Sequence, residues 1–77
     1  MELTVEFVGP MRRPWPERRR AVTVPEGTSL LTLATTLGYA PDEARHLVFA
    51  VNGVKVRGDT APKTGDRVSV LLMVGGG

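Results

Sequence analysis

The chain is 77 residues long, carries a formal net charge of +2 and contains no cysteine. This length suits a single domain, and the lack of cysteine excludes a disulfide framework, a thiolate zinc site and a cysteine nucleophile. His46 is the single histidine, too little for a histidine-rich metal centre or a conventional triad without help from another chain, so we expect no metal site.

Residues 2–8 alternate polar and apolar side chains, which predicts a half-buried strand with Leu3, Val5 and Phe7 on its buried face. The N-terminal residues contain no basic start and no long apolar run. We therefore expect no secretory signal and no membrane span, and hence a cytoplasmic protein.

Residues 9–20 contain three prolines and five arginines, which predicts a long basic loop after the first strand. The rest of the chain is net negative, so the basic charge is concentrated in this segment. Its role stays open between a solvated loop, a docking site for an acidic protein face and a nucleic-acid site with a stacking aromatic ring. Trp15 could equally pack back onto the edge of the sheet. The residues of the docking or nucleic-acid site would be Arg12, Arg13, Trp15, Arg18, Arg19 and Arg20.

Alternation resumes over residues 20–24, which predicts a second strand with Val22 and Val24 facing inward. After a turn at 25–27, apolar residues recur at the i, i+3, i+4, i+7 spacing of an amphipathic helix. We expect Thr28 to cap the start of this helix and Gly38 to end it. Its apolar positions are Leu30, Leu33, Ala34 and Leu37.

Residues 40–46 predict a short helical turn that begins at Pro41. Asn52-Gly53 then lies between two apolar runs and predicts a tight hairpin, because both central residues of such a turn need positive φ. A turn at 64–66 leads into a last strand over residues 67–74. If its alternating valines face the helix, Leu71 and Met73 lie on the opposite face.

These elements predict an α+β fold in which one main helix packs on one face of a mixed four- to five-stranded sheet. With a right-handed crossover between the second and third strands, this is the ubiquitin-like β-grasp. We expect one domain over residues 1–74, including the basic loop 9–20, and a flexible glycine tail at 75–77.

Three segments carry a resemblance to the ThiS/MoaD sulfur-carrier family. They are the helix segment VPEGTSLLTLATTLG, the hairpin AVNG at residues 50–53, and TGDRVSVLLMVGGG at residues 64–77. Two features depart from the family pattern: the loop 9–20 is longer and more basic, and the tail has three glycines. A triple glycine resembles some thiazole-pathway carriers, whereas molybdopterin-type carriers usually have another residue before the final pair.

The resemblance implies that the working group is the C-terminal carboxylate, here on Gly77. A ubiquitin-activating-like adenylating enzyme, using ATP and magnesium, would convert it to an acyl-adenylate. A sulfur donor of the cysteine desulfurase or rhodanese type would then form a thiocarboxylate. A sulfur-accepting synthase would use that sulfur in molybdopterin, tungstopterin or thiamine biosynthesis. The chain itself would bind no cofactor, and it would be a sulfur-carrying co-substrate or small subunit of an enzyme complex and not an enzyme.

The tail and the strand before it receive their expected roles from the same resemblance. Gly75 and Gly76 would thread the partner's active site, because glycine has no Cβ to obstruct close approach. Leu71 and Met73 would form a docking surface beside the reactive end. Two alternatives stay open. A ubiquitin-like modifier would form isopeptides through the same tail, and a non-covalent binding module would use the arginine segment.

Overall fold

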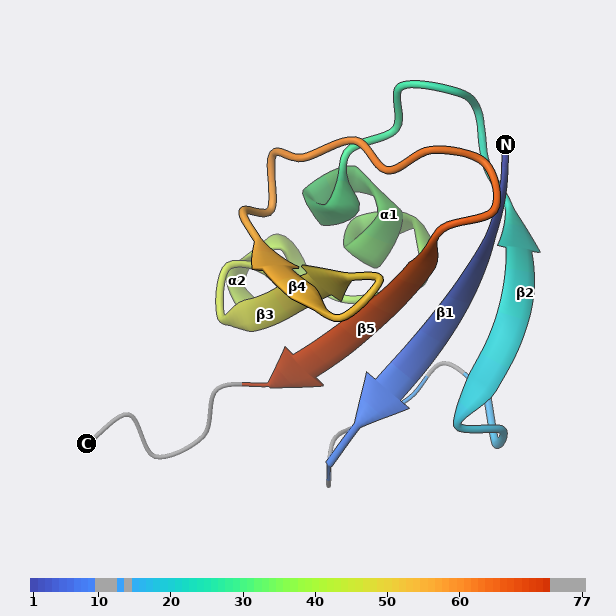
Figure 1. Ribbon diagram of the computed structural model, residues 1–77. Helices are drawn as coiled ribbons and strands as arrows, with labels where there is room; N and C mark the ends of the chain where they lie inside the picture. The colour runs from blue at the N-terminus through green and yellow to red at the C-terminus, as the bar shows by residue number, and fades with distance from the viewer. Residues whose placement is uncertain (10–12, 14, 73–77) are drawn as a thin grey trace.

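The computed structural model of the chain describes residues 1–9, 13 and 15–72, with the backbone alone at Leu72. Its described part is a five-stranded sheet with α1 packed on one face and α2 beside the sheet's end (Figure 1). The elements in chain order are β1 (Glu2–Val8), β2 (Arg19–Thr23), α1 (Leu30–Thr36), α2 (Pro41–Ala44), β3 (Leu47–Val51), β4 (Val54–Val56) and β5 (Arg67–Leu72). The predicted α+β class is confirmed.

The strand order is β2-β1-β5-β3-β4, so the first and last strands lie side by side at the centre. β1 and β5 run parallel, while the pairs β1–β2, β3–β4 and β3–β5 are antiparallel. The chain therefore crosses from β2 to the far half of the sheet through α1. This mixed sheet with its covering helix is the predicted β-grasp.

The core lies between α1 and the inner face of the sheet. The buried hydrophobic side chains are Leu3, Val5, Phe7, Val24, Leu30, Leu33, Ala34, Tyr39, Ala44, Leu47, Phe49, Val68 and Val70. The alternation in the first and last strands and the helical spacing thus select the residues that the core uses. Burying each large apolar side chain contributes about 2 kcal/mol to the stability of the fold. This burial holds α1 in place although its short span contains three threonines.

The start of α1 differs from the prediction. Ser29, and not Thr28, is the N-cap, and its side-chain oxygen accepts a hydrogen bond of 3.2 Å from the backbone N–H of Thr32. Thr28 instead donates its hydroxyl to the carbonyl of Pro25 at 2.6 Å and closes the preceding turn. Serine and threonine can both cap a helix. Ser29 is the cap here because the hydroxyl of Thr28 is bonded to Pro25 in the turn. Gly38 follows the helix with φ 111°, as a left-handed C-terminal position requires.

The start of β2 also differs from the prediction. The strand begins at Arg19, so the segment between β1 and β2 covers residues 9–18 and not 9–20. The cause is long-range pairing, because Glu6 pairs with Arg19 and the N–H of Phe7 donates to the carbonyl of Arg18 at 2.9 Å. At the other end of the chain, residues 73–77, with the predicted end of the last strand and the glycine tail, lie outside the described residues.

The remaining turns agree with the sequence. Asn52 has φ 52° and Gly53 has φ 85°, which confirms the predicted hairpin between β3 and β4. α2 begins at Pro41 as expected, and Gly65 has φ 91° in the turn before β5.

Candidate functional site

The outer face of the sheet, opposite α1, carries exposed apolar side chains near the end of β5. Leu71 is 41% exposed and Val8 is 40% exposed. The parallel register pairs these two residues, and the antiparallel register places the half-buried Val48 on the other side of Leu71. We call Val8, Val48 and Leu71 the outer apolar patch. Apolar side chains exposed side by side typically mark a surface that contacts another molecule.

The exposure of Leu71 agrees with the sequence prediction. Val68 and Val70 are 0% and 3% exposed, so they point into the core and Leu71 points to the opposite face. Met73 lies outside the described residues. The docking role of Leu71 and Met73 stays a prediction.

Sequence reasoning missed Val8 and Val48. The alternation in residues 2–8 already places Val8 opposite the core residues, so this signal was available. Its contact with β5 was not, because Val8 and Leu71 become neighbours only through long-range strand register.

The predicted reactive tail follows this patch directly in the sequence. The backbone of Leu72 pairs with Leu47 of β3, so the described part of β5 ends beside the outer apolar patch. Gly75, Gly76 and Gly77 lie outside the described residues, and their roles stay predictions.

Trp15 in the arginine segment packs inward. Its ring centroid lies 5.5 Å from that of Phe7 in an edge-to-face arrangement, and the Cζ of Arg20 lies 4.9 Å from its centroid. These geometries are favourable aromatic and cation–π contacts. The indole is therefore engaged by the protein itself, which is the alternative in which Trp15 packs onto the sheet. The buried Nε1 of Trp15 has no hydrogen-bond partner among the described residues.

Two arginines of the predicted basic loop 9–20, which the structure places at the start of β2, are paired with acids. Nε of Arg19 lies 3.6 Å from Oε2 of Glu6, and Nη2 of Arg20 lies 3.1 Å from both carboxylate oxygens of Glu17. The backbone N–H of Glu17 and then the Arg20 guanidinium lower the pKa of the Glu17 carboxyl.

The other arginines of the segment differ from these two. Arg13 and Arg18 are exposed and form no ion pair within the described residues. Arg12 lies outside that part of the chain. Within the described residues, the structure thus divides the predicted cluster into arginines that have an acidic partner and arginines that have none.

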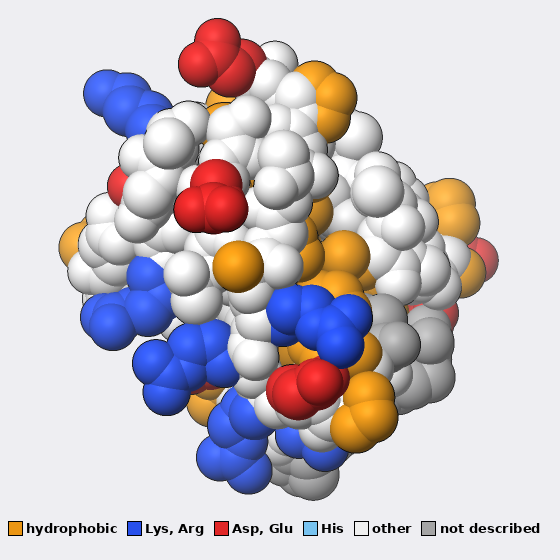
Figure 2. Space-filling view, turned by 90° about the vertical axis from the view of Figure 1, so that its right-hand side faces the viewer, with side chains coloured by type: hydrophobic (Ala, Val, Ile, Leu, Met, Phe, Trp, Pro, Cys, Tyr) orange, Lys and Arg blue, Asp and Glu red, His pale blue; other side chains and the backbone are white. Residues whose placement is uncertain are grey.

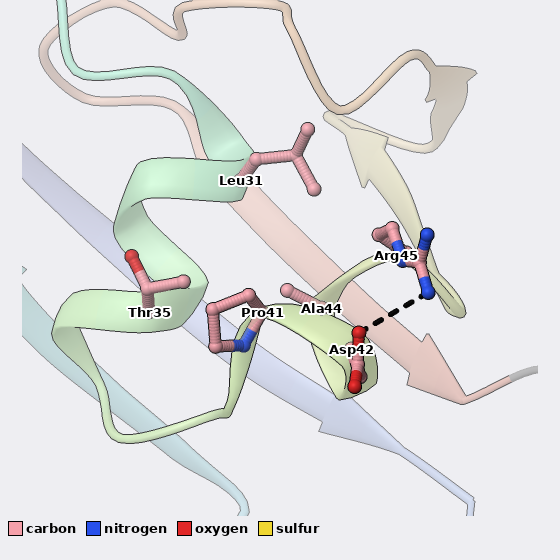
Figure 3. Close-up of a pocket in the computed structure, with 6 residues that line it drawn as sticks. All are labelled: Leu31, Thr35, Pro41, Asp42, Ala44 and Arg45. Carbon is pink, nitrogen blue, oxygen red and sulfur yellow. Dashed lines mark hydrogen bonds and ion pairs between the residues drawn. The ribbon is translucent and has the colours of Figure 1, made fainter.

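A shallow hollow of about 380 Å³ lies between α1 and α2 (Figure 3). Its floor is mostly apolar, and an ion pair of 3.1 Å between Arg45 and Asp42 lies at its rim. The lining residues are Leu31, Thr35, Pro41, Asp42, Ala44 and Arg45. Sequence reasoning did not find this hollow, because it depends on how the two helices pack.

The described part of the chain contains neither a metal-binding cluster nor a membrane-spanning helix. No group of three or more His, Asp or Glu side chains there is placed to hold a metal ion. No helix in residues 1–9, 13 and 15–72 is long and apolar enough to cross a membrane.

Comparison with protein families gives a match over almost the whole length. The model of the ThiS family matches residues 5–77. No curated protein is significantly similar to the chain in sequence.

Solved structures with the same fold extend this comparison. SAMP1 from Haloferax volcanii is 19% identical, with a TM-score of 0.71 and 100% of both chains covered. A putative molybdopterin converting factor subunit 1 from Pyrococcus furiosus is 21% identical, with a TM-score of 0.72 and coverage of 95% of this chain and 98% of that chain. A chain from the complex of subunits 1 and 2 of molybdopterin-converting factor from Helicobacter pylori 26695 is 25% identical, with a TM-score of 0.65 and 100% of both chains covered.

Proposed function

The chain belongs to the ThiS family, and from this premise we propose that it is a sulfur carrier whose C-terminal carboxylate, on Gly77, is the reacting group. The observation that carries the proposal is the extent of the family match, which runs through the three terminal glycines to residue 77. On this proposal the chain is a charged co-substrate of larger enzymes and not a catalyst.

The proposed chemistry begins at an oxygen of the C-terminal carboxylate and continues at its carbon. An oxygen of the Gly77 carboxylate attacks the α-phosphorus of ATP in a partner adenylating enzyme, with magnesium bound there, and pyrophosphate leaves. The terminal sulfur of a persulfide on a donor protein then attacks the acyl carbon and displaces AMP. A thiol reductant cleaves the resulting acyl disulfide, which releases the thiocarboxylate and leaves the donor in a mixed disulfide with that thiol. Glycine suits this carbon because no side chain hinders the approaching nucleophile. The absence of cysteine from the chain fits a carrier whose sulfur is held at the terminus.

The outer apolar patch is the surface that we propose for the partner enzyme. Val8 and Leu71 are exposed next to the last described residue of β5, so an enzyme that binds them is positioned to receive the tail. Three extended residues reach about 10 Å, enough for residues 75–77 to enter a narrow channel. The Helicobacter pylori relative is a complex between two subunits of molybdopterin-converting factor, which supports an enzyme subunit as the partner.

The carrier would deliver its sulfur to a synthase in cofactor biosynthesis of the molybdopterin, tungstopterin or thiamine type. The names of two structural relatives favour molybdopterin, whereas the family model and the triple glycine favour the thiazole of thiamine. Intact-mass analysis of the carrier recovered from each synthase distinguishes these pathways, because only the correct synthase consumes the thiocarboxylate.

Mass spectrometry of the charged chain tests the proposal. The full chain is incubated with the cognate adenylating enzyme, ATP, magnesium and a sulfur donor, and we expect a mass gain equal to replacement of one oxygen by sulfur. A variant lacking Gly77 is the matched control, and it should fold normally but gain no mass. An unchanged mass for the full chain in the presence of an active enzyme contradicts the proposal. A covalent adduct on Lys55 or Lys63 of a second chain would instead identify a ubiquitin-like modifier.

A further inference from the structure

β2 forms one edge of the sheet, and its outer side carries backbone groups with no partner among the described residues. The strand order places β1 on one side of β2, and no described segment covers the other side (Figure 1). On the paired side, the N–H of Phe7 donates to the carbonyl of Arg18, and the N–H of Val24 donates to the carbonyl of Met1. Backbone groups alternate in direction along an antiparallel strand. The N–H and C=O groups of Arg19, Ala21 and Thr23 therefore point away from the sheet.

The start of this edge is basic. Arg18 is exposed and has no acidic partner among the described residues, and the side chain of Arg19 stays 63% exposed beside Glu6. Figure 2 looks onto this side of the molecule and shows several Lys and Arg side chains gathered over its lower half. Past the other end of the strand the charge changes sign, because Thr23 pairs with Glu2 and Glu26 lies in the next turn.

We propose that the β2 edge binds an acidic segment of a partner protein, which adds to the sheet as an extra strand. The outward backbone groups of Arg19, Ala21 and Thr23 would hydrogen-bond the added strand, as in other cases of strand addition. Arg18 and the largely exposed Arg19 would select a segment that is acidic at the end lying against the start of β2. This surface is separate from the outer apolar patch, and the proposal does not depend on sulfur transfer.

The contacts of the arginine segment favour a peptide over a nucleic acid. Binding of a single-stranded nucleic acid depends on aromatic rings that stack on bases and on several unpaired cations along the backbone. Here Trp15 is held between Phe7 and Arg20, while Glu17 and Glu6 partly neutralise Arg20 and Arg19. In contrast, the outward backbone N–H and C=O groups of β2 have the same spacing as those of an extended peptide, so the two can pair.

A second copy of this chain fits this edge less well than an acidic strand. Two β2 edges pairing antiparallel about Ala21 would place Arg19 of each copy opposite the uncharged Thr23 of the other, and the nearest acids, Glu2 and Glu26, lie off that strand. Charged side chains on an edge strand are a known means of preventing such self-association. The β2 strand contains neither proline nor a bulge that would block a foreign strand.

Fluorescence anisotropy with a labelled synthetic peptide tests the proposal. The probe is a short peptide of alternating valine and threonine that ends in a run of aspartates, and the control peptide has lysines in place of the aspartates. The key variant is Ala21→Pro, which removes an outward N–H while leaving the bonds to β1 in place, since proline is tolerated on edge strands. We expect Ala21→Pro to weaken binding at least about tenfold, and the matched Ala21→Thr, which keeps the N–H, to stay within about twofold.

A charge variant keeps the test decisive if Ala21→Pro fails to fold. Arg18→Glu changes no backbone group, and it should weaken binding of the acidic peptide, whereas Arg45→Glu, in the turn after α2, should not. Equal binding of the acidic and lysine peptides, or no effect of Arg18→Glu, overturns the proposal. So does tighter binding of a single-stranded RNA probe, or dimer formation in sedimentation that Ala21→Pro abolishes.

Discussion

The Nδ2 of Asn52 donates a hydrogen bond of 3.0 Å to Oδ1 of Asp66, which joins the β3–β4 hairpin to the turn before β5. Oδ1 of Asn52 accepts a second bond of 2.9 Å from the backbone N–H of Arg67. Asn52 thus serves two purposes: it adopts the positive φ of the hairpin and it clamps the hairpin to the last strand.

Replacement of Asn52 should separate these two contributions. Asn52→Ala loses the clamp and also places a Cβ-bearing residue at φ 52°, whereas Asn52→Gly loses the clamp but tolerates that φ. We expect both variants to be less stable than the natural chain, with the alanine variant below the glycine variant by about 1 kcal/mol. Urea unfolding followed by far-UV circular dichroism measures the difference. Equal stabilities of the alanine and glycine variants would show that the positive φ at position 52 does not affect the stability of the fold.

Asp66 should make the stability of the fold depend on acidity. The N–H of Lys63 and then the side-chain amide of Asn52 hydrogen-bond the carboxylate, and they lower its pKa below the ordinary value of 3.8. A lowered pKa stabilises the folded state at a pH above that value, and this contribution is lost as the pH falls through the folded pKa. We expect Asp66→Asn to be less stable than the natural chain at neutral pH. The difference in their free energies of unfolding should shrink as the pH falls below about 4.

Urea unfolding at a series of pH values checks this prediction for Asp66. The double variant Asn52→Gly with Asp66→Asn is the control, and it should lose less than the sum of the two single variants because they share one hydrogen bond. A stability difference between Asp66→Asn and the natural chain that stays constant between about pH 2.5 and 7 contradicts the prediction.

Leu30 and Leu31 are neighbours in sequence with opposite surroundings. Leu30 is 0% exposed in the core, whereas Leu31 is 36% exposed at the hollow between the helices. Leu30→Ala should cost about 3 kcal/mol, more than half of the stability of about 5 kcal/mol expected of so small a domain. Leu31→Ala removes the same atoms and should cost less than about 1 kcal/mol. Denaturant unfolding of the pair distinguishes them, and similar losses would contradict the assignment of the core.

Gly58 is restricted by a side chain and not by its own backbone. An added Cβ would lie 2.7 Å from Cγ of Leu31, while the carbonyl of Gly58 accepts the N–H of Leu31 at 2.9 Å. We expect Gly58→Ala to lower stability by about 1–2 kcal/mol through overpacking. Adding Leu31→Ala to this variant should restore most of the lost stability, as measured by thermal unfolding. Failure of the second change to rescue would show that the clash has another source.

Leu71 should matter for the partner enzyme and not for the fold. Its side chain is exposed on the outer apolar patch, so Leu71→Glu should fold normally but lower kcat/KM for adenylation by about tenfold or more. Val54→Glu is the matched control, because Val54 is 64% exposed on β4, away from the tail. Pyrophosphate release by the partner enzyme measures both variants. Equal kcat/KM values would place the docking surface elsewhere.

Local signals predicted most of the fold because its turns and faces are encoded locally. Asn52-Gly53 specifies its hairpin, and alternation in residues 2–8 specifies which side chains of β1 enter the core. The start of β2 could not be predicted in this way, since Arg19 joins the strand only because Glu6 lies opposite. The choice between Thr28 and Ser29 as the cap similarly depends on a contact with Pro25.

The candidate site was predictable along one strand but not between strands. Alternation indicated that Leu71 is exposed, but its pairing with Val8 follows from the parallel register of the first and last strands. The arginine segment was recognised from composition, yet composition could not distinguish paired from unpaired arginines. That distinction depends on Glu6 and Glu17. The pairing of β1 with β2 places Glu6 beside Arg19, and the bend before β2 places Glu17 beside Arg20.

The packing of Trp15 against Phe7 and beneath Arg20 gives the protein a built-in spectroscopic reporter. The chain contains a single tryptophan, so its tryptophan emission comes from one end of the β1–β2 pair. Circular dichroism, in contrast, averages over every strand and helix. Coincident unfolding curves from the two signals would show that this end melts with the whole domain, whereas an earlier change in emission would reveal that it opens first.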